Sequence, residues 1–115
     1  MKTLCLLSIL LLSACSVFDN EQDIENSDII ATANDPVFSV LNKSEQSILF
    51  LVIETNTAAV IDLADPCIDF NPNLAPNSKT QLNYSDIWGW KQGDDSVWFY
   101  WTDCKGSGES KTIKL

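Results

Sequence analysis

The sequence predicts an all-β protein, a small antiparallel β-sandwich. Two observations support this class. Short runs rich in Ile, Val, Leu and Phe alternate with polar turns, and no segment carries a long apolar repeat at helical spacing. A compact β-barrel is the alternative, because the number of strands does not distinguish one closed sheet from two stacked sheets.

The first fourteen residues have the layout of a secretory signal peptide. Met1 and Lys2 give a positive start, residues 4–12 (LCLLSILLL) form an apolar run, and the small residues Ser13 and Ala14 follow. The run is much shorter than the ~20 apolar residues that span a bilayer. We therefore expect residues 1–14 to be removed after export.

The end of this run, Leu12-Ser13-Ala14-Cys15, resembles the lipobox of bacterial lipoproteins. The resemblance implies that Cys15 becomes the first residue and carries a diacylglycerol and an N-acyl chain such as palmitate. Several acyl chains anchor a protein stably to a membrane. Because Ser16 rather than Asp follows the cysteine, the resemblance implies sorting to the outer membrane in a Gram-negative host. The alternative is an ordinary signal peptide with an incidental cysteine.

The predicted segment after the anchor, residues 15–34, is an acidic tether. Six acidic residues and no basic one lie between positions 19 and 35, with few large apolar side chains. Such a stretch buries too little apolar surface to offset its chain entropy. It would lift a domain off the membrane, or alternatively serve as an acidic docking arm for a basic partner.

The remaining residues, 35–115, are predicted to form one β domain of immunoglobulin-like architecture. A proline- and asparagine-rich loop is expected at residues 65–78. The predicted strands are residues 37–41 (VFSVL), 47–54 (SILFLVIE), 58–63 (AAVIDL), 79–84 (KTQLNY), 96–103 (SVWFYWTD) and 111–115 (KTIKL).

Two cysteines are left once the signal peptide is removed and Cys15 is acylated. Cys67 lies in the proline-rich loop and Cys104 lies at the end of the aromatic strand predicted at residues 96–103. Two thiols in an exported chain most simply form one disulfide. The sequence therefore predicts a Cys67–Cys104 bond.

Composition excludes several kinds of activity. The chain has no histidine, which rules out Ser-His-Asp and Cys-His catalysis and histidine-ligated metals. Loss of Lys2 leaves six lysines against sixteen acidic residues, 6 − 16 = −10, so nucleic acid is a poor partner. We expect no enzymatic activity and no cofactor.

One acidic cluster is a weak candidate for a metal site. Asp62, Asp65 and Asp69 lie close together in the sequence, and carboxylate oxygens suit calcium. Their spacing matches no EF-hand loop, so the simpler interpretation is a solvated acidic loop.

Aromatic residues are the other candidate for recognition. Trp88 and Trp90 are two positions apart, as are Trp98 and Tyr100, so each pair would share one face of a strand. If exposed, the four would form a platform that stacks on a sugar or seats an apolar anchor of a partner. If both sheet faces are covered, the same residues belong to the core.

These observations favour two classes of function. The first is a non-catalytic binding or accessory module, anchored to the cell envelope, for a protein or glycan partner. The second is a structural lipoprotein subunit, or an inhibitor or immunity-type protein that uses its acidic surface against a basic enzyme.

Overall fold

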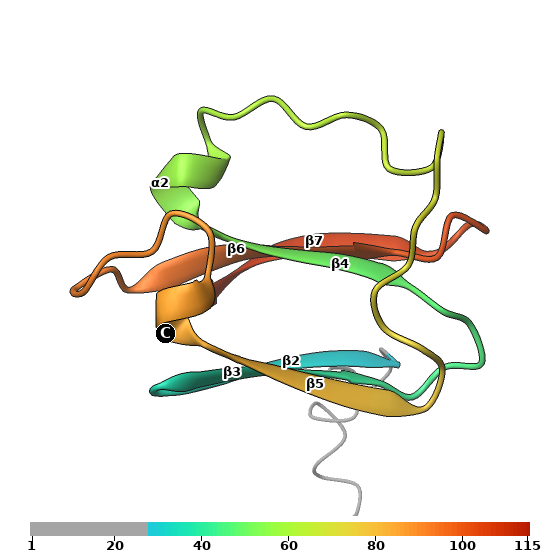
Figure 1. Ribbon diagram of the computed structural model, residues 1–115, viewed down its shortest axis with the longest axis horizontal. Coiled ribbons are helices and arrows are strands. Elements are labelled where there is room, and N and C mark those ends of the chain that lie inside the picture. Colours follow the sequence, from blue (N-terminus) through green and yellow to red (C-terminus); the bar gives the residue numbers. More distant parts are fainter. Residues whose placement is uncertain (1–27) are drawn as a thin grey trace, which may run out of the picture.

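The computed structural model describes residues 28–115 as two antiparallel three-stranded sheets packed face to face (Figure 1). The first sheet has the order β2-β3-β5, formed by Ile29–Asn34, Val37–Asn42 and Ser78–Asn83. The second has the order β4-β6-β7, formed by Leu49–Glu54, Ser96–Thr102 and Gly108–Lys114. The predicted β-sandwich is confirmed.

The strand connections follow the immunoglobulin arrangement. Strands β2, β3 and β5 take the places of A, B and E, and β4, β6 and β7 take those of C, F and G. Within residues 28–115, no strand occupies the place of D. Its position along the chain is filled by the short helix α2 (Thr55–Ala58) and by residues 59–77, here called the β4–β5 loop. A 3-10 turn, η2 (Tyr84–Asp86), begins the return to β6.

The core lies between the two sheets and follows from alternation along the strands. Phe38 and Val40 of β3 and Val97 and Phe99 of β6 are fully buried, and the rings of Phe38 and Phe99 lie 6.1 Å apart. Trp101, the next residue on the same face of β6, packs against this cluster. The outer face of β6 is left to Trp98, Tyr100 and Thr102, so Trp98 and Tyr100 share one face of the strand, as the sequence predicts.

Two predictions about local structure are wrong. Ile29–Asn34, assigned to the tether, pairs in register with β3, so the domain begins before the predicted boundary at Asp35. Residues 58–63, predicted as a strand, lie at the end of α2 and in the loop, and Val60 is 82% exposed. The strand fails because the carboxylate of Glu54 caps a helical turn and the chain leaves the sheet there.

The remaining sequence predictions divide into two groups. The loop predicted at residues 65–78 is present, apart from Ser78, which begins β5. The signal peptide, Cys15 and the tether up to residue 27 lie outside the described residues. Among residues 28–115, no helix is both long enough and apolar enough to cross a membrane.

Candidate functional site

The two outer faces of the sandwich differ in chemistry. On the first sheet the outer face carries mainly polar side chains, among them Ser39, Lys79 and Gln81, which occupy neighbouring register positions. On the second sheet the outer face carries Leu49, Leu51 and Ile53 opposite Thr102, Tyr100 and Trp98. Apolar side chains on an outer face need a cover or a partner, so the second sheet is the place to look for a site.

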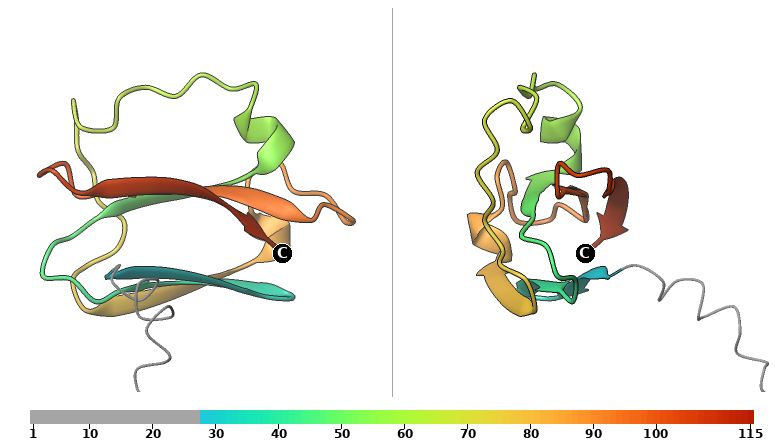
Figure 2. Two further views of the ribbon diagram at one scale, coloured as in Figure 1. Left: turned by 180° about the vertical axis from the view of Figure 1, so that it is seen from behind. Right: turned by 90° about the vertical axis from the view of Figure 1, so that its right-hand side faces the viewer.

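The β4–β5 loop provides part of that cover. In two opposite views it arches over the outer face of the second sheet, from α2 to the start of β5 (Figure 2). Where the chain leaves β4, just before α2 and the loop, the Glu54 carboxylate accepts hydrogen bonds from Asn56 N at 3.0 Å and Thr57 N at 2.9 Å. Glu54 thus fixes the point at which the chain turns away from β4.

A disulfide holds the middle of the loop. Cys67 and Cys104 are bonded, which confirms the predicted pair and ties the loop to the end of β6. Beside it, the Asp103 carboxylate accepts hydrogen bonds from Lys105 N at 2.8 Å and Ser107 N at 3.0 Å. The β6–β7 turn is therefore a firm attachment point for the loop.

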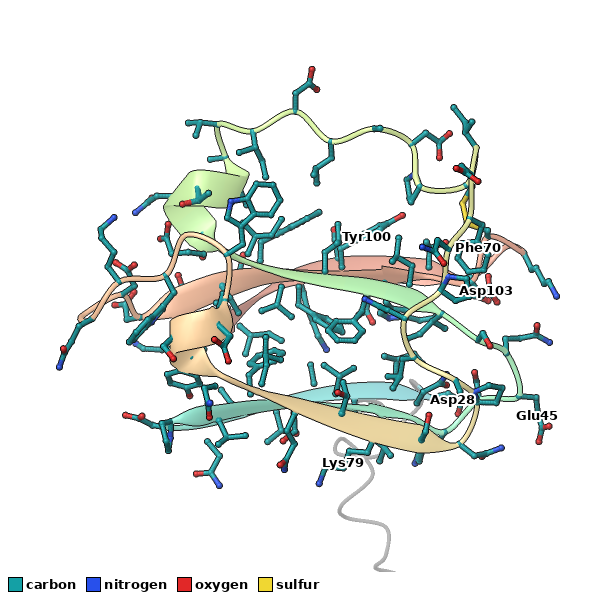
Figure 3. The ribbon with its side chains drawn as sticks, in the orientation of Figure 1. Asp28, Glu45, Phe70, Lys79, Tyr100 and Asp103 are labelled. Atoms are coloured by element: carbon teal, nitrogen blue, oxygen red, sulfur yellow. A yellow bond between two sulfur atoms is a disulfide. The ribbon has the colours of Figure 1, made fainter. Side chains whose placement is uncertain are left out.

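A groove of about 360 Å³ lies between the loop and the sheet. Tyr100 lies on this side of the sheet (Figure 3). The rings of Trp98 and Tyr100 are stacked, 5.5 Å apart and within 7° of parallel. The groove is lined by Leu49, Leu51, Leu63, Ala64, Asp65, Pro66, Trp98 and Tyr100, so its walls are mostly apolar.

A second hollow of about 400 Å³ continues on the far side of Trp98. It lies between α2 and β7 and is lined by Thr55, Ala58, Ala59, Trp98 and Thr112. Trp98 borders both hollows, so its indole is the central side chain of this surface.

The structure does not bring the four predicted platform residues together. Trp90 packs against the core between the sheets, with its ring 6.0 Å from that of Tyr84, so its assignment to a platform is wrong. Trp88 is 53% exposed, and its backbone bridges Ile53 at the edge of β4. Only Trp98 and Tyr100 lie in the groove, and there they stack on each other beneath a loop rather than forming an open platform.

The loop itself presents the exposed apolar side chains that sequence analysis missed. Val60 and Ile68 are more than 80% exposed, and Leu63 is 41% exposed. Residues 58–63 were predicted as a strand, which hid this exposure. The missed signal is the alternation of these apolar residues with Asp62, Asp65 and Asp69 in a segment rich in proline.

One of the three loop aspartates, Asp65, has a structural role. The Asp65 carboxylate accepts a hydrogen bond from Cys67 N at 2.9 Å and so shapes the turn at the disulfide. Within residues 28–115, no three His, Cys, Asp or Glu side chains are grouped as a metal site requires. The weak calcium candidate therefore gains no support.

Two carboxylates have lowered pKa values, and both do structural work. The backbone N–H of Asn56 chiefly lowers the pKa of Glu54, and the backbone N–H of Lys105 chiefly lowers that of Asp103. Hydrogen bonds to the ionised form cause this direction of shift. Both acids are thus held ionised as caps of turns, with their carboxylate oxygens engaged by backbone N–H groups.

An acidic hollow lies at the end of the sandwich, away from the groove. Figure 3 shows Asp28, Glu45 and Asp103 at this end, and the open space beside them is about 660 Å³. These three carboxylates extend the negative electrostatic potential to the end of the molecule that carries the disulfide.

Comparison of the chain with protein-family models, with curated proteins and with solved structures found no match.

Proposed function

We propose that this protein is a non-catalytic binding module, anchored to the cell envelope through an acylated Cys15, that recognises a protein partner with its β4–β5 loop. One observation carries the proposal. Val60, Leu63 and Ile68 are exposed on a loop that a disulfide ties down above an apolar groove. A loop held at both ends and in the middle loses less conformational entropy on binding, which favours recognition.

The lining of the groove favours a protein over a glycan. Leucine, alanine and proline side chains dominate it, and the polar groups that hydrogen-bond sugar hydroxyls are few. A stacked Trp98–Tyr100 pair with apolar neighbours suits an aliphatic or aromatic anchor from a partner. Such anchors supply most of the binding energy at protein interfaces.

Charge indicates which kind of protein would bind. Residues 44–78 contain five acidic residues, Glu45, Glu54, Asp62, Asp65 and Asp69, and no lysine or arginine. A partner with basic residues around an apolar anchor would complement this surface and be steered toward it. This asymmetry also favours the second candidate function, an inhibitor or immunity-type protein directed against a basic enzyme.

Support for a non-catalytic role comes from the acids and from composition. The chain has no histidine, and the carboxylates with shifted pKa values, Glu54 and Asp103, are engaged by backbone amides. The proposed address is the outer membrane if the host is Gram-negative, because Ser16 follows Cys15.

Site-specific photo-cross-linking in the producing cell tests the proposal. A photoreactive amino acid placed at Ile68 should yield a discrete cross-linked protein, whereas the same group at Leu41, on the outer face of β3, should not. Replacing Asp62 and Asp69 by lysine should weaken the product at Ile68, because the partner is basic. Equal products from Ile68 and Leu41, or none from Ile68, would contradict recognition by this loop.

A further inference from the structure

The outer edge of β7 is an unpaired strand edge within residues 28–115. Strand β7 (Gly108–Lys114) pairs with β6 on one side, and no described strand or loop pairs with its other side. Ser107 O accepts from Asp103 N at 3.1 Å, and Leu115 N donates to Asp95 O at 2.8 Å. Because backbone groups alternate in direction along an antiparallel strand, the backbone N–H and C=O groups of the odd-numbered residues of β7 point toward β6. Gly108, Ser110, Thr112 and Lys114 therefore direct their backbone N–H and C=O groups outward.

The opposite edge of the same sheet is closed, which shows how this fold blocks an edge. Phe50 N donates to Asn73 Oδ1 at 2.9 Å, and Asn73 Nδ2 donates to Phe50 O at 3.0 Å. Farther along β4, Glu54 N donates to Trp88 O at 2.9 Å. Side-chain and loop groups thus occupy the β4 edge, whereas β7 offers a template for another strand.

The sequence of β7 is complementary to itself in one register. If two copies meet antiparallel with Ser110 opposite Ser110, Glu109 of each copy lies opposite Lys111 of the other. Gly108 then lies opposite Thr112, so the outward backbone groups of Gly108, Ser110 and Thr112 all find partners. Shifting the centre to Lys111 would place the two Lys111 side chains against each other, and centring on Thr112 would leave Glu109 and Lys111 without opposite charges. Charge therefore selects the Ser110-centred register.

From this complementarity we propose that two copies of the chain pair through β7 to form a symmetric dimer with a continuous six-stranded sheet. The twofold axis of an antiparallel strand pair is perpendicular to the sheet, so equivalent layers of the two copies lie on the same side. Both β4–β5 loops then face one way, and both chains enter β2 at Asp28 in the other layer. Two copies held on one membrane can adopt this arrangement, and their confinement raises the effective concentration.

Charge exchange at β7 tests the dimer, using the unacylated chain from Ser16 to Leu115. Sedimentation equilibrium should show a monomer–dimer equilibrium for the parent chain. Lys111→Glu, which puts like charges opposite each other twice, should raise the dissociation constant at least about tenfold. Adding Glu109→Lys should restore it to within about threefold of the parent, because the ion pairs return with reversed polarity. A monomer at every concentration, or a dimer indifferent to both changes, would overturn the proposal.

Cysteine cross-linking tests the register itself. Cα atoms of a hydrogen-bonded antiparallel pair lie about 5.5 Å apart, within the range of a disulfide. Ser110→Cys should form a covalent dimer under mild oxidation, and Thr32→Cys, on the edge strand β2 of the other sheet, should stay monomeric. Circular dichroism of both variants checks that the fold is intact. Failure of Ser110→Cys to cross-link in a folded protein, or equal cross-linking through Thr32→Cys, would refute this register.

Discussion

Removing the disulfide should cost the domain about 4 kcal/mol of stability. Cys67 and Cys104 are 37 positions apart, and the chain-entropy model assigns roughly 13 cal/mol/K to closing a loop of that length, or about 4 kcal/mol at 25 °C. A domain of this size loses about 4–8 °C in melting temperature per kcal/mol. We therefore expect Cys67→Ala with Cys104→Ala to melt about 20 °C lower than the parent.

The assay is thermal unfolding followed by circular dichroism, with and without a reducing agent. The parent should lose about 20 °C on reduction, and the doubly substituted variant should not respond to the reductant, which controls for other effects of the reagent. A fall of less than about 5 °C would refute the entropic reasoning. It would mean that the unfolded chain is already compact near these residues, or that the bond costs native-state enthalpy.

Two further predictions concern Glu54, at the end of β4, and Gly89, in the connection between η2 and β6. The folded-state pKa of Glu54 is lowered from 4.5, so its contribution to stability is complete above pH 4.5 and is lost as the pH falls through the folded-state pKa. The urea midpoint of the parent should therefore fall between about pH 5 and about pH 3, and Glu54→Gln should make that fall smaller. An unchanged slope of urea midpoint against pH would contradict this role of Glu54. Gly89 and Gly93 both have positive φ, but a Cβ at Gly89 would overlap the side chain of Thr57, whereas one at Gly93 meets nothing within 4 Å. Gly89→Ala should therefore cost about 1–3 kcal/mol more than Gly93→Ala in chemical denaturation, and equal losses would show that the site relaxes freely.

Alternation and composition made most of the strands predictable. Residues 96–103 combine β-branched and aromatic side chains, and their parity correctly placed Trp98 and Tyr100 on one face of a strand. The disulfide followed from counting cysteines in an exported chain. These features depend on local pattern or on elimination, which a sequence shows directly.

What escaped prediction depended on tertiary contacts. Residues 29–34 (IIATAN) have only two large apolar side chains, and their strand exists because β3 lies beside them to pair with. Residues 58–63 (AAVIDL) have a strand-like composition, but no neighbouring strand is available where Glu54 turns the chain away. Spacing alone could not show that Trp90 is packed against the core while Trp98 lies in the groove, because spacing predicts which face of a strand a side chain is on and not what covers that face.

The composition of the core has a consequence for how this protein can change over time. None of the large side chains packed between the sheets comes from residues 55–73, since the core takes Val52 before that segment and Leu74 after it. Substitutions in the segment therefore leave the main source of folding energy intact, provided that the cysteine bond is kept. Natural selection can alter the exposed segment to follow a changing target while the scaffold stays the same, and an engineer could exchange its sequence for the same reason.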